Sequence, residues 1–346
     1  MSLAAAIETA VRGDEVPAPM LEAAFGEIMD GKATPVVIAA LLIALRTKGE
    51  TVGELVSAAR ALRSRAQQVS VRDPRTLDTC GTGGDGAGSF NISTTAAFVV
   101  AGAGVPVAKH GNRGATSRAG SFDVLEALGV EIELPVETAV RVLDEVGIAP
   151  FFARVAHPAM RFVASVRREL GVRTLMNCMG PLLSPVGARR QLIGVYEPAL
   201  CALLGRVLFA LGTDSALLVH GSDGLDEITI TGSTHAVRVG GACGEGRAFE
   251  IDPRRLGLPL GRSEDLRGGD AAENAAILRS VLAGEKGPRR DVVCLNAAAA
   301  LWVADAAGSL GEGLALAQES LDSGAARAKL DALVRATNAA RAGVMA

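Results

Sequence analysis

The sequence has few aromatic residues, no two cysteines close together in the chain and almost no net charge. Phe, Trp and Tyr make up only 3% of its 346 residues, so the apolar fraction of 49% rests mainly on Ala, Val and Leu, which suit a packed core. The 35 Lys and Arg residues nearly balance 38 Asp and Glu residues, leaving a net charge of −3. Because electrostatic nucleic-acid binders usually carry a basic excess, we expect no nucleic-acid partner.

Three further classes of protein are disfavoured by what is missing. The five cysteines are widely spaced and form no C-x-x-C pair, so neither a disulfide framework nor a zinc site is expected. The uncharged apolar stretches 94–108 and 174–188 are shorter than the ~18–20 apolar residues of a membrane span. The N-terminus has no basic region and becomes acidic at Glu8, so we expect no signal peptide and a cytoplasmic protein.

The length indicates about two domains, at roughly 150 residues each. Residues 1–70 contain only helical patterns. Thr34-Pro35 begins one helix, and Thr51 with Glu54 has the spacing of a capping box before another. We expect a small helical domain over 1–70, joined by helices near 166–190 and serving as a scaffold or a dimer contact.

From about residue 71 the pattern changes to short β-like runs that alternate with helical segments such as 136–146 and 198–211. This alternation predicts an α/β domain over 71–346 with a mainly parallel sheet flanked by helices. A segment rich in Pro and Gly, 180–187, is where we expect the chain to cross between domains. The predicted strands are 76–80, 105–108, 130–134, 216–219, 227–231 and 236–239.

The strongest local signal is a glycine-rich loop between a predicted strand and a helix. Residues 80–95 read CGTGGDGAGSFNISTT, with five glycines in eight residues before an Asn/Ser/Thr cluster. Glycines let the backbone approach a ligand closely, and a capped helix start offers N–H groups to an anion. The loop matches neither the P-loop nor the dinucleotide motif. It predicts a phosphate or pyrophosphate site, with an ordinary glycine-rich turn as the alternative.

A second polar loop, KHGNRGATSR over 109–118, follows the predicted strand 105–108. Ligands of an open α/β sheet bind at the carboxyl ends of its strands, where this loop begins. Its three cations, amide and hydroxyls fit a clamp for a polyanion. A solvated loop is the alternative.

Two further segments contain residues suited to binding. The adjacent carboxylates Asp226 and Glu227 follow a predicted strand and fit Mg²⁺, although such pairs on loops are often only solvated. Residues 157–174 predict a helix that begins at Pro158. Arg167 on this helix fits a substrate carboxylate if it points into a cleft, and solvent if it does not.

The ordered combination of motifs resembles the anthranilate phosphoribosyltransferase family over nearly the whole chain. The motifs are GTGGD (81–85), NIST (91–94), KHGNR (109–113), DVLEALG (123–129), HPAM (157–160), RT (173–174), GPL (180–182) and LDE (225–227). This resemblance implies transfer of the phosphoribosyl group of phosphoribosyl pyrophosphate (PRPP) to the amine of anthranilate, in tryptophan biosynthesis. It also implies Mg²⁺ and a homodimer formed through the helical domain.

The resemblance also implies roles for individual residues. Ser93, Asp226 and Glu227 would hold Mg²⁺, while Gly81, Asn112 and Arg167 would bind anthranilate. Lys109, Asn112 and Arg167 would act in catalysis. The residues implied for PRPP are Gly81, Gly84, Asp85, Ser89, Asn91, Ile92, Ser93, Thr94, Lys109, His110, Gly111, Asn112, Arg113, Gly114, Ala115, Thr116, Ser117 and Ser121.

The sequence departs from the family pattern at three positions: Ser89 replaces Thr, Ala119 stands where Ser is expected, and Phe122 is bulkier than usual. Two alternative functions stay open. A pyrimidine-nucleoside phosphorylase shares the glycine-rich loop and a Lys, but not the Asp-Glu pair. A non-catalytic paralogue that binds nucleic acid would be basic.

Overall fold

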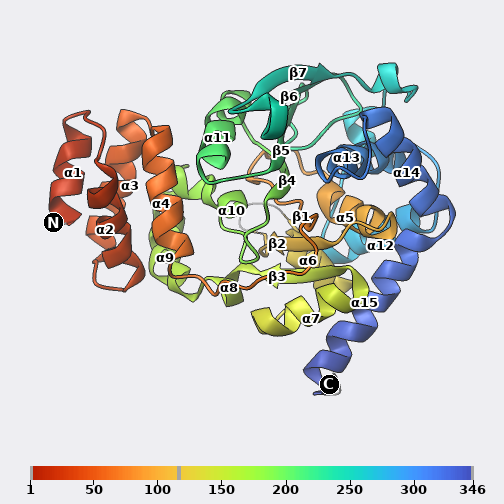
Figure 1. Ribbon diagram of the computed structural model, residues 1–346, viewed down its shortest axis with the longest axis horizontal. Coiled ribbons are helices and arrows are strands. Elements are labelled where there is room, and N and C mark those ends of the chain that lie inside the picture. The colour runs from red at the N-terminus through yellow and green to blue at the C-terminus, as the bar shows by residue number, and fades with distance from the viewer. Residues whose placement is uncertain (1–2, 115–117, 344–346) are drawn as a thin grey trace.

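A computed structural model of the protein describes residues 3–114 and 118–343. Over these residues a small helical lobe adjoins a larger lobe built on one sheet (Figure 1). The helices of the small lobe are α1 (Leu3–Val11), α2 (Ala18–Met29), α3 (Pro35–Lys48) and α4 (Val52–Arg63). This α/β architecture with an N-terminal helical part confirms the predicted fold class.

The predicted capping box at the start of α4 is present. The Glu54 backbone N–H donates to Thr51 Oγ1 at 3.2 Å, and the Thr51 N–H donates to Glu54 Oε2 at 3.0 Å. Glu54 is 1% exposed and also accepts from Lys48 Nζ at 2.9 Å, which satisfies its charge. The box therefore fixes the start of α4 against the end of α3.

The large lobe contains one sheet in which five strands are parallel and two antiparallel strands extend one edge, among the described residues. The strand order is β3-β2-β1-β4-β5-β6-β7, so the chain leaves β1 toward one edge and returns at β4 toward the other. The strands are β1 (Leu77–Asp78), β2 (Val107–Gly111), β3 (Ile148–Phe152), β4 (Arg190–Gly194), β5 (Ser215–Gly221), β6 (Thr234–Val239) and β7 (Arg247–Ile251).

Helices cover both faces of the sheet (Figure 1). On β5, Leu217 and Val219 join the core beneath α5 and α13, whereas Ala216 and Leu218 join the core beneath α11, because successive strand side chains point to opposite faces. The remaining helices are α5 (Ile92–Gly102), α6 (Ser121–Ala127), α7 (Val136–Val146), α8 (Ala153–Ala156), α9 (Arg161–Leu170), α10 (Met179–Leu182), α11 (Pro198–Ala210), α12 (Ala271–Leu282), α13 (Pro288–Val303), α14 (Leu310–Asp322) and α15 (Ala325–Arg341).

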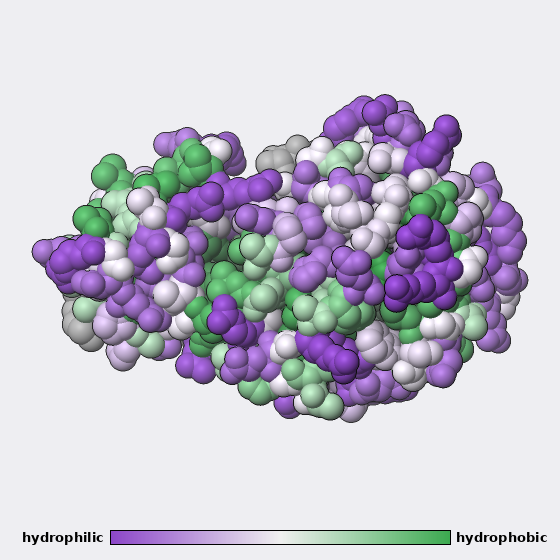
Figure 2. Space-filling view, turned by 90° about the horizontal axis from the view of Figure 1, so that it is seen from above, coloured by the Kyte–Doolittle hydropathy of each residue, from purple (hydrophilic) through white to green (hydrophobic). Residues whose placement is uncertain are grey.

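The helical lobe shares its core with part of the large lobe. Buried residues of α1–α4 form one apolar cluster with Val163 and Val166 of α9, with α11 and with one face of β4–β6. Figure 2 shows the molecule from above, with polar residues over most of the visible face and apolar residues where the two lobes meet. Among the described residues, no helix is long and apolar enough to cross a membrane.

Two of the predicted strands are wrong. Residues 130–134 alternate buried and exposed side chains, but they pack against α15, where the Glu131 N–H donates to Thr337 Oγ1 at 3.1 Å. Residues 227–231 form a turn whose backbone bonds to side chains, as when the Thr229 N–H donates to Thr234 Oγ1 at 3.0 Å. In 130–134 the alternation reflects burial against α15 and not strand pairing. In 227–231 only the sequence alternates, because Ile228, Thr229 and Ile230 are all buried. Strands β3, β4 and β7 were missed.

Candidate active site

The loops that carry the predicted site residues meet at the point where the strand order reverses. Strands β1 and β4 are neighbours in the sheet, although β2 and β3 lie between them in the chain. The loops after β1, β2, β4 and β5 all leave the same edge, since these strands are parallel. Ligands of open α/β sheets bind at such a reversal, outside the carboxyl ends of the strands.

The glycine loop leads from β1 into α5 and lies close to the loop after β5. Gly83, Gly84, Gly86 and Gly88 all have positive φ, between 64° and 81°, which favours glycine. The Thr82 N–H donates to Gly194 O at 2.9 Å, which ties the loop to the end of β4. A Cβ atom on Gly81 would lie 3.2 Å from both Asp226 Oδ2 and Gly194 O, so a larger residue would crowd the site.

Three carboxylates gather beside this loop. The Ser93 N–H at the start of α5 donates to Glu227 Oε1 at 3.0 Å, and the Asp226 N–H lies 3.4 Å from Asp85 Oδ2. Burial raises the pKa of Glu227 to about 7, while Lys109 and Ser93 act in the opposite direction. Burial and the nearby Asp85 also raise the pKa of Asp226. The cluster therefore has a deficit of positive charge.

Lys109 lies on the floor of the site. It is 3% exposed, and its Nζ donates to Thr79 O at 2.9 Å. Burial lowers the pKa of Lys109, whereas Asp78 and Glu227 raise it. Its ammonium is thus held at Thr79, just after β1, within electrostatic range of Glu227.

Asp78 connects β1 to β2 where the two strands separate. Its Oδ1 accepts from the His110 N–H at 3.1 Å, in place of a backbone partner. Burial raises the pKa of Asp78 to about 7, against the opposing effect of Lys109. Ligand atoms of Asp78, Cys80 and His110 lie within 4.8 Å of one another, but burial raises the pKa of the Cys80 thiol, which disfavours the thiolate a metal would need.

Two buried histidines pack together beside the site. The rings of His110 and His157 meet edge to face, 5.2 Å apart between centroids. Burial lowers the pKa of His110 to about 3 and the pKa of His157 to about 4, so both imidazoles are neutral at pH 7. They shape an uncharged wall.

Arg167 is supplied by α9, whose other face belongs to the core of the helical lobe. Its pKa is lowered by burial, and within the described residues its guanidinium has no hydrogen-bond or ion-pair partner. Such a group is suited to bind an anionic ligand. After α9, Arg173 Nη2 donates to Gly84 O at 2.5 Å. The Arg173 guanidinium lies over the Tyr196 ring, with its central carbon 4.1 Å from the ring centroid.

The loop after β2 is held by its own side chains. Asn112 is exposed, its Oδ1 accepts from the Arg113 N–H at 2.8 Å, and its carbonyl accepts from Ser121 Oγ at 3.4 Å. Asp123 Oδ2 accepts the N–H groups of Gly114 and of Gly120, each at 2.8 Å. The predicted residues Ala115, Thr116 and Ser117 lie outside the described residues.

Not every side chain predicted for PRPP faces the loop. Ile92 and Thr94 are buried at the start of α5, so only their backbone could contact a ligand. Asn91 is held from the far side, where Asn274 Nδ2 donates to its Oδ1 at 2.9 Å. Ser89 forms a bridge with Arg267, which fastens the end of the loop to the segment before α12.

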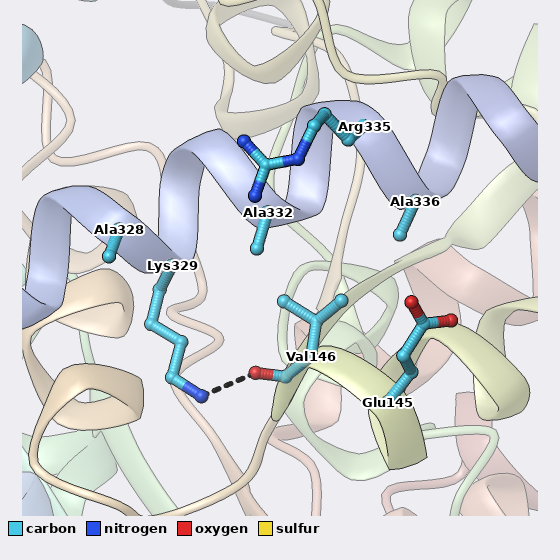
Figure 3. A pocket seen from close by; sticks show the side chains of 7 residues that line it. All are labelled: Glu145, Val146, Ala328, Lys329, Ala332, Arg335 and Ala336. Atoms are coloured by element: carbon cyan, nitrogen blue, oxygen red, sulfur yellow. Dashed lines mark hydrogen bonds between the residues drawn. The ribbon is translucent and has the colours of Figure 1, made fainter.

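A separate hollow between α7 and α15 does not carry the site. It has a volume of about 400 Å³ and lies at the amino end of β3, the edge opposite the glycine loop. Figure 3 shows Lys329 reaching across to the Val146 carbonyl, where its Nζ donates at 2.6 Å. Its lysine thus holds the end of α7.

Comparison with known proteins shows the family to which the chain belongs. Two family models match the chain: "Glycosyl transferase family, helical bundle domain" over residues 4–66 and "Glycosyl transferase family, a/b domain" over residues 73–327. Anthranilate phosphoribosyltransferase from Moorella thermoacetica is 53% identical over 96% of this chain and 97% of its own length. The chain belongs to the anthranilate phosphoribosyltransferase family.

Further members agree in sequence and in fold. The enzyme from Symbiobacterium thermophilum is 51% identical over 98% of each chain. The crystal structure of anthranilate phosphoribosyltransferase from Thermus thermophilus has a TM-score of 0.91 and 44% identity, covering 96% of this chain and 99% of that one. The Saccharomyces cerevisiae enzyme in complex with PRPP and Mg has a TM-score of 0.88 and 26% identity, covering 97% and 98%. Neither alternative function is favoured.

Two residues that support the acid pair and the glycine loop had no role predicted from the sequence. Asn296 of α13 is fully buried, its Oδ1 accepts from the Ile228 N–H at 3.0 Å, and its Nδ2 donates to Ile228 O at 2.8 Å. It thereby fixes the backbone directly after Glu227. Arg173 holds Gly84, as described above. The RT motif pointed to Arg173, but only the fold brings Asn296 to a turn 68 residues away.

Proposed function

We propose that the protein transfers the phosphoribosyl group of PRPP to the amine of anthranilate, giving N-(5′-phosphoribosyl)anthranilate and pyrophosphate. One observation carries the proposal: a glycine loop, a buried lysine and three clustered carboxylates meet where the sheet order reverses. A diphosphate needs such donors, and its counter-cation needs such acids. Because the chain belongs to the anthranilate phosphoribosyltransferase family, the acceptor is anthranilate.

The PRPP site consists of the glycine loop and the loop after β2. The diphosphate lies against the backbone N–H groups of 81–85 and the start of α5, with Lys109 as the fixed positive charge below it. Gly84 and Asp85 form one wall and Asn91 and Ser93 the other. The remaining residues of this set are Gly81, Ser89, Ile92, Thr94, His110, Gly111, Asn112, Arg113, Gly114, Ala115, Thr116, Ser117 and Ser121.

The residues present fit Mg²⁺. Asp226 and Glu227 would hold the ion with the hydroxyl of Ser93, and Asp85 lies beside them. Hard oxygen ligands suit this cation, and the raised pKa values of both acids reflect negative charge that burial has left uncompensated. When bound, Mg²⁺ neutralises the leaving diphosphate.

Anthranilate fits between Arg167 and the glycine loop. Its carboxylate pairs with the free guanidinium of Arg167, while Asn112 and the backbone of Gly81 approach the ring and amine. Because α9 belongs to the helical-lobe core and Gly81 to the loop after β1 of the large lobe, the two lobes together orient the amine.

In the reaction, the bond from C1 of the ribose to the diphosphate oxygen breaks and a bond from C1 to the anthranilate nitrogen forms. The nitrogen then loses one proton, to the departing diphosphate or to water. Negative charge grows on the diphosphate as the sugar becomes cationic. Lys109 and the loop N–H groups are already aimed at that charge. Removing one such fixed donor commonly lowers the rate by ~10²–10³-fold. The neutral rings of His110 and His157 add no positive charge near the sugar.

The architecture divides into a helical domain over 1–70, joined by the helices near 166–190, and a catalytic domain over 71–346.

We propose that two copies form a homodimer through the helical domain. Val36 on α3 is 78% exposed, and Ala40 one turn on is also exposed, so α3 offers an uncovered apolar stripe to a second copy. The cytoplasm, where an enzyme of tryptophan biosynthesis would meet both substrates, is its proposed location.

A fluorescence assay tests the function. Anthranilate consumption is followed with PRPP present, with and without Mg²⁺, and phosphorolysis of thymidine is measured in parallel. We expect consumption that requires both PRPP and Mg²⁺, and no thymidine cleavage. Phosphorolysis without anthranilate consumption would contradict the proposal.

A further inference from the structure

A cavity of about 530 Å³ lies at the edge of the sheet opposite the active site. It is formed where β5 begins, by the β6–β7 hairpin and by the end of α13. The active-site loops leave the carboxyl ends of the parallel strands, so the body of the sheet separates the two places. The volume is in the range of small-molecule sites.

The main feature of this cavity is Arg238. Its guanidinium stacks over the Trp302 ring at 3.7 Å, and Phe249 meets the same ring edge to face at 6.0 Å. Across residues 3–114 and 118–343, Arg238 has no side-chain hydrogen bond and no ion pair. Its face is covered and its N–H edge is free, which is the arrangement that binds a carboxylate or phosphate in a bidentate manner.

The acidic residues around the cavity are already paired. Asp214 pairs with Arg189 at 2.6 Å, and Asp305 pairs with Arg190 at 2.5 Å. Ser215 also lines the cavity, is 6% exposed, and has a buried hydroxyl without a partner in the described structure. The unused groups are therefore hydrogen-bond donors beside an aromatic wall.

We propose that this cavity is a second binding site, for a small aromatic oxyanion. The carboxylate or phosphate group of the ligand lies on the free N–H edge of Arg238, in the part of the cavity that Ser215 lines. The aromatic ring of the ligand lies along Phe249 and the β6–β7 hairpin. A Cβ on Gly240 would lie 2.1 Å from Asp214 O, so glycine lets the end of β6 pack against the start of β5 and form this wall of the cavity. This inference is independent of the proposed reaction.

Trp302 is the only tryptophan of the chain, so its fluorescence reports on this cavity directly. The full-length protein, without Mg²⁺, is titrated with benzoate, phenyl phosphate and inorganic phosphate. We expect saturable changes in Trp302 emission with the two aromatic anions. Saturation by benzoate alone would identify a carboxylate site, and saturation by phenyl phosphate alone a phosphate-ester site. We expect inorganic phosphate to bind more weakly than either aromatic anion, because it has no ring to contact Phe249.

The variants Arg238→Gln and Arg141→Gln separate this site from general charge effects. Arg141 is exposed on α7 and serves as the matched control. We expect Arg238→Gln to weaken binding of the aromatic anions by roughly tenfold or more, since a charge-assisted pair is lost, and Arg141→Gln to leave it unchanged. Calorimetry repeats the comparison in case Arg238→Gln alters the emission itself. No saturation with either aromatic anion, or equal affinity in both variants, would overturn the proposal.

Discussion

The Asn296→Ala variant tests whether one buried amide holds the acid pair in place. Asn296 contributes three hydrogen bonds: with the Ile228 N–H at 3.0 Å, Ile228 O at 2.8 Å and Val292 O at 2.9 Å. Its removal leaves two backbone groups of Ile228 buried without a partner. Each such group costs ~1–3 kcal/mol, so we expect roughly 2–6 kcal/mol of lost stability.

Two measurements separate the structural effect from the functional one. Denaturant unfolding gives the loss of stability, and the Mg²⁺ concentration for half-maximal activity reports the geometry of Asp226 and Glu227. We expect that concentration to rise in the folded variant, with a smaller change in the anthranilate KM. The control is Asn338→Ala, whose amide is exposed and donates to Gly129 O at 2.8 Å. Unchanged stability and Mg²⁺ response in Asn296→Ala would refute the reasoning.

Three other predictions concern charge. Replacing both Asp226 and Glu227 by their amides should abolish Mg²⁺-dependent turnover, and near-normal rates at saturating Mg²⁺ would count against the metal assignment. Arg167→Ala should raise the anthranilate KM at least tenfold with little effect on the PRPP KM, whereas exposed Arg168→Ala should change neither; equal effects on both substrates would indicate a structural role. Burial raises the pKa of Asp78 from 3.8 to about 7. Between pH 3.8 and about 7 the native state therefore binds more protons than the unfolded state. The contribution of Asp78 to stability is present below pH 3.8 and is lost as the pH rises through about 7. Unfolding measured from pH 4.5 to 7.5 should therefore show a flatter fall in stability for Asp78→Asn; an identical slope would refute this.

The local chemistry of the site could be predicted from the sequence because it is carried by short motifs. The capping box at Thr51 and the glycine loop depend on residues a few positions apart, and the structure has them as expected. Asp226 and Glu227 were expected on a loop after a strand, and they lie on the loop after β5. The convergence of these segments could be expected once parallel strands were inferred, since such strands share a carboxyl edge.

What could not be predicted depends on contacts between distant segments. Strand β3 is a fully buried run of five residues without alternation, so its pattern did not distinguish strand from helix. Residues 130–134 alternate because they pack on α15, not because they pair. The core that α1–α4 share with α11 left no local signal either.

The central claim is that the diphosphate of PRPP lies between the glycine loop and the acid pair. A crystal structure of this protein soaked with PRPP and Mg²⁺ tests it most directly. The account predicts diphosphate density against residues 81–85 and above Lys109, with the ion touching Asp226 and Glu227. Density for that group at another edge of the sheet, or an ion away from both carboxylates, would contradict it.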